Sequence, residues 1–209
     1  MTEPSFLKRI LETKQAEIDA GRTSSVVHRA IDLWTVGESQ VEECDPVFEF
    51  LDDGNHLGIA EYIKRFELAV EARQFSMARW LGKSIDQNHI DIAAQWINAQ
   101  RNPETFVRNY KKLANSAESN RQIAYALERL TYADPELALE LFQPIVRGKR
   151  LPAELEFRTA RHIALWTARD NLPGGYDLLV KLPVAAQNDE VMRWRARTCL
   201  LYTSDAADD

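Results

Sequence analysis

Apolar residues recur at helical spacing within Glu43–Ile85 and predict two helices joined by a short turn. The first stripe steps by four, three and four residues, through Ile59, Ile63, Phe66 and Val70. Glu71–Gln74 interrupts it, and a second stripe follows at Met77, Trp80, Leu81 and Ile85. Small residues that would let the two helices approach closely stand at Ala60, Ala69, Ala72 and Ala78. We therefore expect an antiparallel helix pair here.

Helical patterns continue along the rest of the chain. The expected segments are Pro4–Asp19, Ser24–Trp34, one starting at Asp45-Pro46, Ile90–Gln100, Pro103–Leu113, Ser119–Tyr132, Asp134–Val146, Pro152–Arg169, Gly175–Val180 and Asn188–Leu200. Asn102 and Asp134 are expected to cap the helices that follow them, because their side chains can accept from free N–H groups of the first turn. Pro144 should end or kink its helix. No run alternates long enough to predict a strand.

Each predicted pair has an apolar face that it cannot bury alone, so neighbouring pairs must stack. The pairing period is roughly 30–40 residues, in the range of helical-repeat proteins. There is no regular repeated consensus, which favours divergent pairs over a regular tetratricopeptide array. The predicted fold class is all-α: an irregular superhelix of stacked antiparallel helix pairs.

The amino-acid sequence of these predicted helices resembles that of a known family. LWTVGESQ, ECDPVFEFL and YIKRFELAVEARQFSMARWL, all within Leu33–Leu81, resemble the α-superhelical region of the soluble lytic murein transglycosylases. The resemblance continues more weakly from about Ala30 to about Arg197, through NAQRNPETFVRNY, QIAYALERLTYADPELALELF and ELEFRTARHIALW. It implies the N-terminal, ring-forming part of a periplasmic enzyme that cleaves the glycan strands of peptidoglycan. The partners it implies are those strands and a catalytic domain missing from this chain.

The resemblance also shapes the expected domain organisation. Residues 1–198 are predicted to form one scaffold domain, a fragment of the parent protein. Residues 199–209, CLLYTSDAADD, resemble translated sequencing-adapter DNA, and the Ser204–Asp209 portion should fray because it has no apolar face. The first five residues form no secretory signal, so the export signal of a periplasmic parent would lie upstream.

Composition narrows the classes of function. A formal net charge of −6 argues against a general nucleic-acid binder, because a phosphate backbone would be repelled. No window approaches the roughly 20 apolar residues of a membrane span. Cys44 and Cys199 make no disulfide framework, and Cys44 is expected to be unpaired. No metal site is expected, since the four histidines lie far apart at His28, His56, His89 and His162. No cofactor is expected either, because the chain has no phosphate-binding glycine loop.

Catalytic chemistry would require a general acid. In the transglycosylases a glutamate within Glu-Ser-aromatic plays this role, and a Gly-Leu-Met-Gln motif follows later. The two Glu-Ser dipeptides, Glu38-Ser39 and Glu118-Ser119, lack both features. A general acid also needs a pocket that raises its pKa, whereas these glutamates fall in a polar link and a helix start. We expect no catalytic residue, and no activity from the chain alone.

Aromatic and basic residues are the remaining candidates for binding. Tryptophans stand at Trp34, Trp80, Trp96, Trp166 and Trp194; exposed ones could pack against sugar rings, but Trp80 and Trp166 are expected in the core. Basic clusters occur at Arg147, Lys149 and Arg150 and at Arg193, Arg195 and Arg197. Either could contact acidic stem peptides of peptidoglycan. The favoured interpretation is a solvated helix end whose charge complements the helix dipole.

Two functions from different classes follow. The first is a non-catalytic scaffold part of a soluble lytic murein transglycosylase, which forms 1,6-anhydro-muramyl ends. The alternative is a stand-alone helical-repeat adaptor that binds a peptide in its concave face, as tetratricopeptide proteins do. A reading frame that continues into the catalytic motifs would favour the first, and one that ends near Asp209 the second.

The stripes themselves can be tested by substitution. Leu81→Asp and Phe66→Asp should each lower the free energy of unfolding by several kcal/mol, because an unpaired charge would be buried. Thermal unfolding followed by circular dichroism measures the effect. An unchanged melting temperature in either variant would contradict the proposed stacking.

Overall fold

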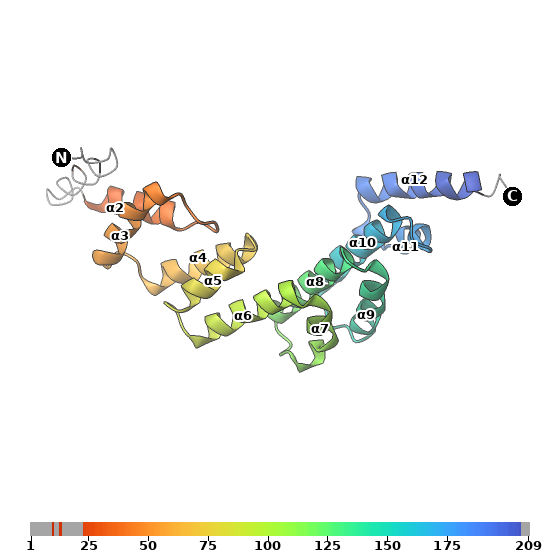
Figure 1. The fold of residues 1–209 in the computed structure, drawn as a ribbon, viewed down its shortest axis with the longest axis horizontal. Helices are drawn as coiled ribbons and strands as arrows, with labels where there is room; N and C mark the ends of the chain where they lie inside the picture. The colour runs from red at the N-terminus through yellow and green to blue at the C-terminus, as the bar shows by residue number, and fades with distance from the viewer. Residues whose placement is uncertain (1–9, 11–12, 14–22, 206–209) are drawn as a thin grey trace. The chain divides into compact units, whose positions relative to one another are not determined.

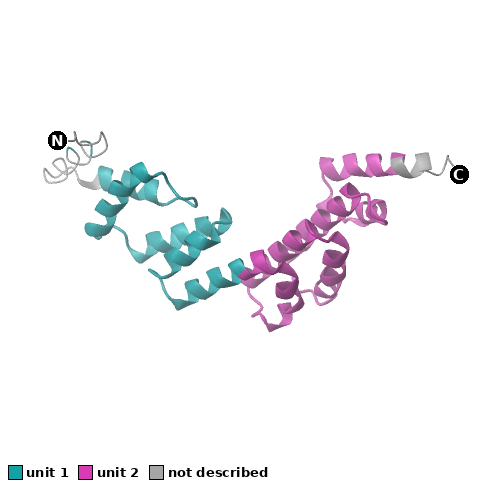
Figure 2. Ribbon diagram, viewed as in Figure 1, with its two compact units in different colours: residues 1–97 teal, residues 98–209 magenta. Residues whose placement is uncertain are grey.

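A computed structural model describes Ile10, Thr13 and residues 23–205, and it divides into two compact units (Figures 1 and 2). Unit 1 is Met1–Ile97 and unit 2 is Asn98–Asp209. The elements before the boundary are α2 (Thr23–Trp34), η2 (Glu42–Cys44), α3 (Asp45–Asp53), α4 (Ile59–Glu71) and α5 (Phe75–Gly82). The boundary falls inside α6 (Gln87–Arg101). The later elements are α7 (Pro103–Arg108), η3 (Tyr110–Lys112), α8 (Ala117–Thr131), α9 (Pro135–Arg147), α10 (Ala153–Arg169), α11 (Gly175–Lys181), η4 (Val184–Ala186) and α12 (Asp189–Asp205).

Every regular element in these described ranges is an α or 3-10 helix, which confirms the all-α prediction. Helices joined by short turns pack side by side, including α4 with α5, α8 with α9 and α10 with α11. Because a short turn reverses the chain, these are the stacked antiparallel pairs that the sequence predicts. No helix among the described residues is long and apolar enough to cross a membrane.

The α4–α5 pair forms as predicted, with its turn where the apolar stripe is interrupted (Figure 1). α4 ends at Glu71 and α5 begins at Phe75. Ala69 and Ala78 are fully buried, as expected for residues at a helix crossing. Arg73, in the turn, has a φ of 60°, which lets three residues reverse the chain.

Two members of the predicted stripes are exposed. Trp80 is 55% exposed and Ile59 is 60% exposed, so both predictions of burial are wrong. The buried face of α5 is instead formed by Phe75, Ala78 and Leu81, at spacings of three. Phe75, which follows the turn directly, stacks on Trp96 of α6 with ring centroids 5.1 Å apart. This contact rotates the apolar face of α5 away from Trp80.

In unit 2, α8 is the central helix and packs against α7, α9 and α10. Most of its residues are buried, from Ser119 to Thr131, and only Ala117, Arg121 and Arg129 are classed as exposed. Its buried Glu128 accepts a hydrogen bond from Nε of Arg158 on α10 at 2.7 Å. That ion pair keeps a buried carboxylate from being left without a partner.

Two contacts between the α8 segment and α10 share the same offset in the sequence. Glu128 pairs with Arg158, and Tyr132, directly after α8, contacts His162. Both pairs are separated by 30 residues (158 − 128 and 162 − 132). α8 and α10 therefore run parallel, with α9 reversed between them. This offset agrees with the pairing period of roughly 30–40 residues that the sequence predicts.

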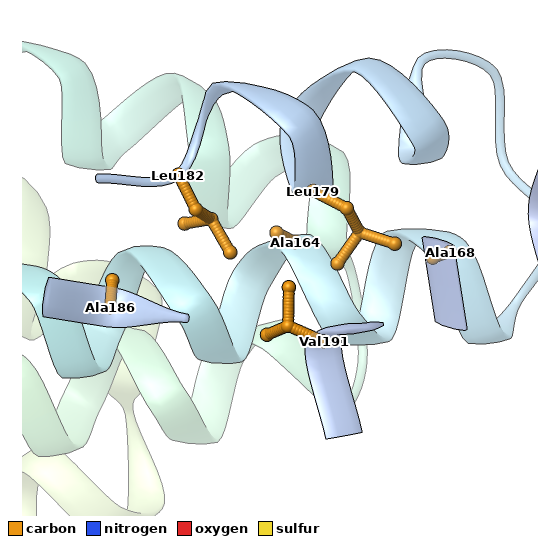
Figure 3. Close-up of a cluster of buried hydrophobic side chains, with 6 residues drawn as sticks. All are labelled: Ala164, Ala168, Leu179, Leu182, Ala186 and Val191. Atoms are coloured by element: carbon orange, nitrogen blue, oxygen red, sulfur yellow. The ribbon is translucent and has the colours of Figure 1, made fainter. Parts of the chain in front are cut away.

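A second core in unit 2 joins the elements that follow α10 (Figure 3). Its buried side chains are Ala164, Ala168, Leu179, Leu182, Ala186 and Val191. The alanines of α10 leave space for the leucines of α11 and of the segment after it. Gly175 at the start of α11 lies so close to α10 that a Cβ there would be 2.8 Å from the Cα of Ala168.

Helix starts differ in part from the predicted ones. α6 begins at Gln87, three residues early, because Asp86 Oδ1 accepts from the backbone N–H of His89 at 2.9 Å. Asp134 caps α9 as predicted, accepting from the N–H of Leu137. Asn102 forms no side-chain cap; its amide donates to Asn98 Oδ1 instead. The predicted helix Pro103–Leu113 is also divided: α7 ends at Arg108, and the 3-10 turn η3 follows it.

Helix ends also differ. α9 continues past Pro144 to Arg147, so the proline does not end it. α12 continues to Asp205, so Ser204 is helical rather than frayed, and residues 206–209 lie outside the described range. The predicted helix Pro4–Asp19 also lies outside it, except for Ile10 and Thr13, both helical.

The close approach at Gly175 predicts a strong steric effect. Gly175→Ala should lower the free energy of unfolding by about 1–3 kcal/mol, because backbone atoms of Ala168 must move to admit the methyl group. Gly148→Ala is the matched control: φ is −79°, and the nearest atom to an added Cβ is the Pro144 carbonyl oxygen at 3.2 Å, so a shift of a few tenths of an ångström admits the methyl group. Urea unfolding should show the first variant destabilised clearly more than the second. Equal effects would contradict the tight α10–α11 contact.

Candidate functional site

Two clusters of aromatic and charged side chains are candidate sites, one in each unit. The cluster in unit 1 surrounds Arg65 of α4. Its guanidinium carbon lies 4.5 Å from the ring centroid of Trp34 on α2 and 5.5 Å from that of Phe48 on α3. Tyr62 meets Trp34 edge-on with centroids 5.0 Å apart, and its hydroxyl donates to Asp52 Oδ1 at 3.2 Å. These contacts join three helices around one cation.

Burial governs the electrostatics of the Arg65 cluster. Arg65 is 5% exposed, and among the described residues its Nε has no hydrogen-bond partner. Burial therefore lowers the pKa of its guanidinium. Burial, and then the neighbouring Asp52 carboxylate, raises the pKa of Tyr62. A cation enclosed by rings in this way holds the helices together. A large substrate could not reach it, because the side chain is buried.

The cluster in unit 2 is open to solvent. We call it the Tyr132 surface, and it consists of Arg129, Tyr132, His162, Trp166 and Arg169. Tyr132 meets His162 and Trp166 nearly at right angles, with centroid distances of 5.1 and 4.7 Å. Arg129 lies 5.9 Å from the Tyr132 ring and Arg169 lies 4.8 Å from the Trp166 ring. Tyr132 remains 46% exposed.

The structure places the five tryptophans differently. Trp34 and Trp96 are buried, whereas Trp166 and Trp194 are half-buried and Trp80 is exposed. The expectation that Trp166 is core is thus met only in part. Arg197 lies 4.8 Å from the Trp194 ring, which places one residue of the predicted basic cluster on an aromatic face.

The Glu-Ser dipeptides lie apart from both clusters. Glu38 and Ser39 are exposed in the link after α2. Glu118 lies in the first turn of α8 and forms an ion pair with Arg121. Ser119 is buried, and its N–H donates to the Ser116 hydroxyl that caps the helix. The contacts of Glu118 and Ser119 are those of a helix start.

Histidines and cysteines offer no metal chemistry in the described ranges. No group of three His, Cys, Asp or Glu side chains there is placed to hold a metal ion. His56 packs against Phe50, and His89 packs edge-on against Phe66. His89 also binds Asp86, and its hydrogen bonds lower the pKa of that carboxyl. Cys44 is a half-buried free thiol, as expected.

In the basic cluster of Arg147, Lys149 and Arg150, one of the three side chains is already engaged within the chain. Arg150 Nη2 donates to the backbone carbonyl of Ala114 at 2.6 Å, which ties the link after α9 to the link before α8. Arg147 and Lys149 are exposed at the end of α9. A cation here complements the negative end of the helix dipole.

Comparison with known proteins confirms the resemblance drawn from the sequence. The chain is 23% identical to the soluble lytic murein transglycosylase of Escherichia coli K12 over 157 residues, and 24% identical to that of Salmonella typhimurium. These matches cover 75% of this chain but only 24% of each relative, so the chain spans about a quarter of their length. No family model matches the chain.

Solved structures of lytic transglycosylases are also similar to this chain. An inactive mutant of the lytic transglycosylase Slt from Pseudomonas aeruginosa is similar with a TM-score of 0.60 and 26% identity. The match covers 89% of this chain and 30% of that one. The 70-kDa soluble lytic transglycosylase of Escherichia coli gives a TM-score of 0.57 at 18% identity, covering 95% and 30%, which supports the fold alone.

The packing around Arg65 predicts that the volume of its side chain contributes more to stability than its charge does. Arg65→Ala should lower the free energy of unfolding by about 2–4 kcal/mol, because packing between three helices is lost. Arg65→Met keeps the unbranched stem and should cost less than about 1 kcal/mol, since removing a buried charge offsets the lost cation–π attraction. Urea unfolding measures both. If Arg65→Met were as unstable as Arg65→Ala, the charge itself would be the stabilising element.

Proposed function

We propose that this chain is a non-catalytic scaffold part of a soluble lytic murein transglycosylase. Such an enzyme cleaves the glycan strands of peptidoglycan and leaves 1,6-anhydro-muramyl ends. The observation that supports this most is the combined sequence and structural similarity to the Pseudomonas aeruginosa Slt, at 26% identity over 89% of this chain. Similarity to two curated transglycosylases supports the same assignment.

The scaffold role is supported by the way the chain uses its polar groups. Glu118 is paired with Arg121, and the buried Glu128 is paired with Arg158. A glutamate that acts as a general acid needs an environment that favours its protonated form. Both carboxylates of α8 are instead engaged by arginine side chains, and Glu128 is buried between packed helices. The glutamates of α8 therefore suit a structural role.

Stacked helix pairs suit the positioning of a catalytic domain. Within unit 2, α8 is held by three neighbouring helices, and α10 continues the stack to α11 and α12. Each pair is fixed by its neighbours, so a domain mounted on such a stack would keep a constant orientation. In this proposal residues 1–198 form the scaffold domain, and the partners are the catalytic domain and peptidoglycan strands. The location would be the periplasm.

A domain exchange tests the proposal. The matching helical region of the Pseudomonas aeruginosa Slt is replaced by this chain, and release of anhydro-muropeptides from purified sacculi is measured. We expect the chimera to be active and this chain alone to release nothing. The same chimera built on the inactive mutant of that Slt is the control for contaminating activity.

Two outcomes would contradict the proposal. Release of anhydro-muropeptides by this chain alone would disprove the non-catalytic role. A chimera that folds, as judged by circular dichroism, but remains inactive would disprove the scaffold role. The adaptor alternative predicts this second outcome.

A further inference from the structure

We infer that the Tyr132 surface binds a glycan strand that carries carboxylates, as peptidoglycan does through its stem peptides. This inference rests on the proposed function for the identity of the glycan, and on the geometry of unit 2 for the site. It assigns a glycan-binding role to the scaffold itself, apart from any catalytic domain.

The aromatic rings of this surface are held in place before any ligand arrives. Tyr132 contacts two rings of α10, His162 and Trp166, at angles of 85° and 83°. Those two rings lie one helical turn apart, so the backbone of α10 fixes their spacing. A fixed ring loses little conformational entropy when a ligand packs against it.

Exposure distinguishes this cluster from the core. Tyr132 is 46% exposed although it contacts two aromatic side chains, and Trp166 is half-buried. By contrast Trp34, in the Arg65 cluster, is 3% exposed. Aromatic faces are apolar and carry partial negative charge, so they suit the C–H groups on the face of a pyranose ring.

Two arginines give the surface its charge preference. In the described part of the chain, neither Arg129 nor Arg169 takes part in an ion pair, whereas Arg108, Arg121 and Arg158 all pair with glutamates. Both side chains are exposed, and each guanidinium lies within cation–π distance of an aromatic ring, 5.9 Å for Arg129 and 4.8 Å for Arg169. A guanidinium so placed can bind a carboxylate through two parallel hydrogen bonds.

These features together select the class of ligand. The rings favour a sugar face, and the arginines favour an anion beside it. The chain as a whole has a net charge of −6, and Arg129 and Arg169 are the side chains of this surface that can attract an anion. A neutral glycan would use the rings alone and would bind with little dependence on salt.

Binding of the full-length chain to soluble peptidoglycan strands tests the inference. Titration calorimetry is performed with purified uncrosslinked strands, and with neutral chitin oligosaccharides for comparison. We expect Tyr132→Ala to weaken strand binding by about tenfold, as for the loss of one aromatic anchor. Arg169→Gln should weaken it and reduce its salt dependence. Trp80→Ala, which removes an exposed ring from unit 1, is the matched control and should bind as the unaltered chain does.

The outcomes separate this inference from the proposed function. Equal strand binding by the unaltered chain, Tyr132→Ala and Arg169→Gln would overturn the inference. No strand binding by the unaltered chain, together with an active chimera, would also overturn it while leaving the scaffold role intact. Equally tight, equally salt-dependent binding of chitin oligosaccharides would overturn the preference for carboxylates. Arg169 is exposed, so its variant remains decisive even if Tyr132→Ala unfolds.

Discussion

The burial of α8 is the constraint on which unit 2 depends. A helix packed by three neighbours must be apolar or paired on almost every side, and α8 largely meets this with alanines, leucines, a Thr131 hydroxyl bonded to the Leu127 carbonyl and an ion pair to α10. Among the described residues, the Asn120 side-chain oxygen is an exception, because it is buried without a hydrogen-bond partner. Glu128 is tolerated because Arg158 reaches it from α10 at 2.7 Å. The same contact sets α8 and α10 parallel and in register. That register brings Tyr132 against His162 and Trp166, so the candidate glycan surface is a product of the core.

Much of the fold could be predicted from apolar spacing, because the pattern that indicates a helix lies within a few consecutive turns of the sequence. The α4–α5 turn lies at the predicted interruption, and the Asp134 cap forms as expected. One error involves a contact with a distant residue: Trp80 continues an apolar stripe, yet it is exposed, and Phe75 stacks on Trp96 of α6 instead. The other is local: the Asn102 side chain makes no cap on α7, and its amide nitrogen donates to Asn98 Oδ1, four residues earlier.

The candidate site was harder to predict than the fold. Each residue of the Tyr132 surface is visible in the sequence, but Tyr132 and His162 are 30 positions apart, with a whole helix between them. Tyr132 and His162 are separated by the same 30 residues as the ion pair Glu128–Arg158. This shared spacing becomes informative only once the pairing of α8 with α10 is known. The Arg65 cluster is equally hard to predict, because a lone arginine on an apolar stripe does not indicate the rings of α2 and α3 that lie against it.

The shared offset between α8 and α10 limits how this part of the chain can vary over evolution. Substitutions within α9 alter one helix face at a time and can be compensated locally. An insertion or deletion within α9 itself would rotate and shift α10 relative to α8. It would then separate Glu128 from Arg158 and Tyr132 from His162 at the same time. We therefore expect the length of α9 to tolerate less change than the identity of its residues. Changes in length are best absorbed in the links or as the gain or loss of a complete hairpin.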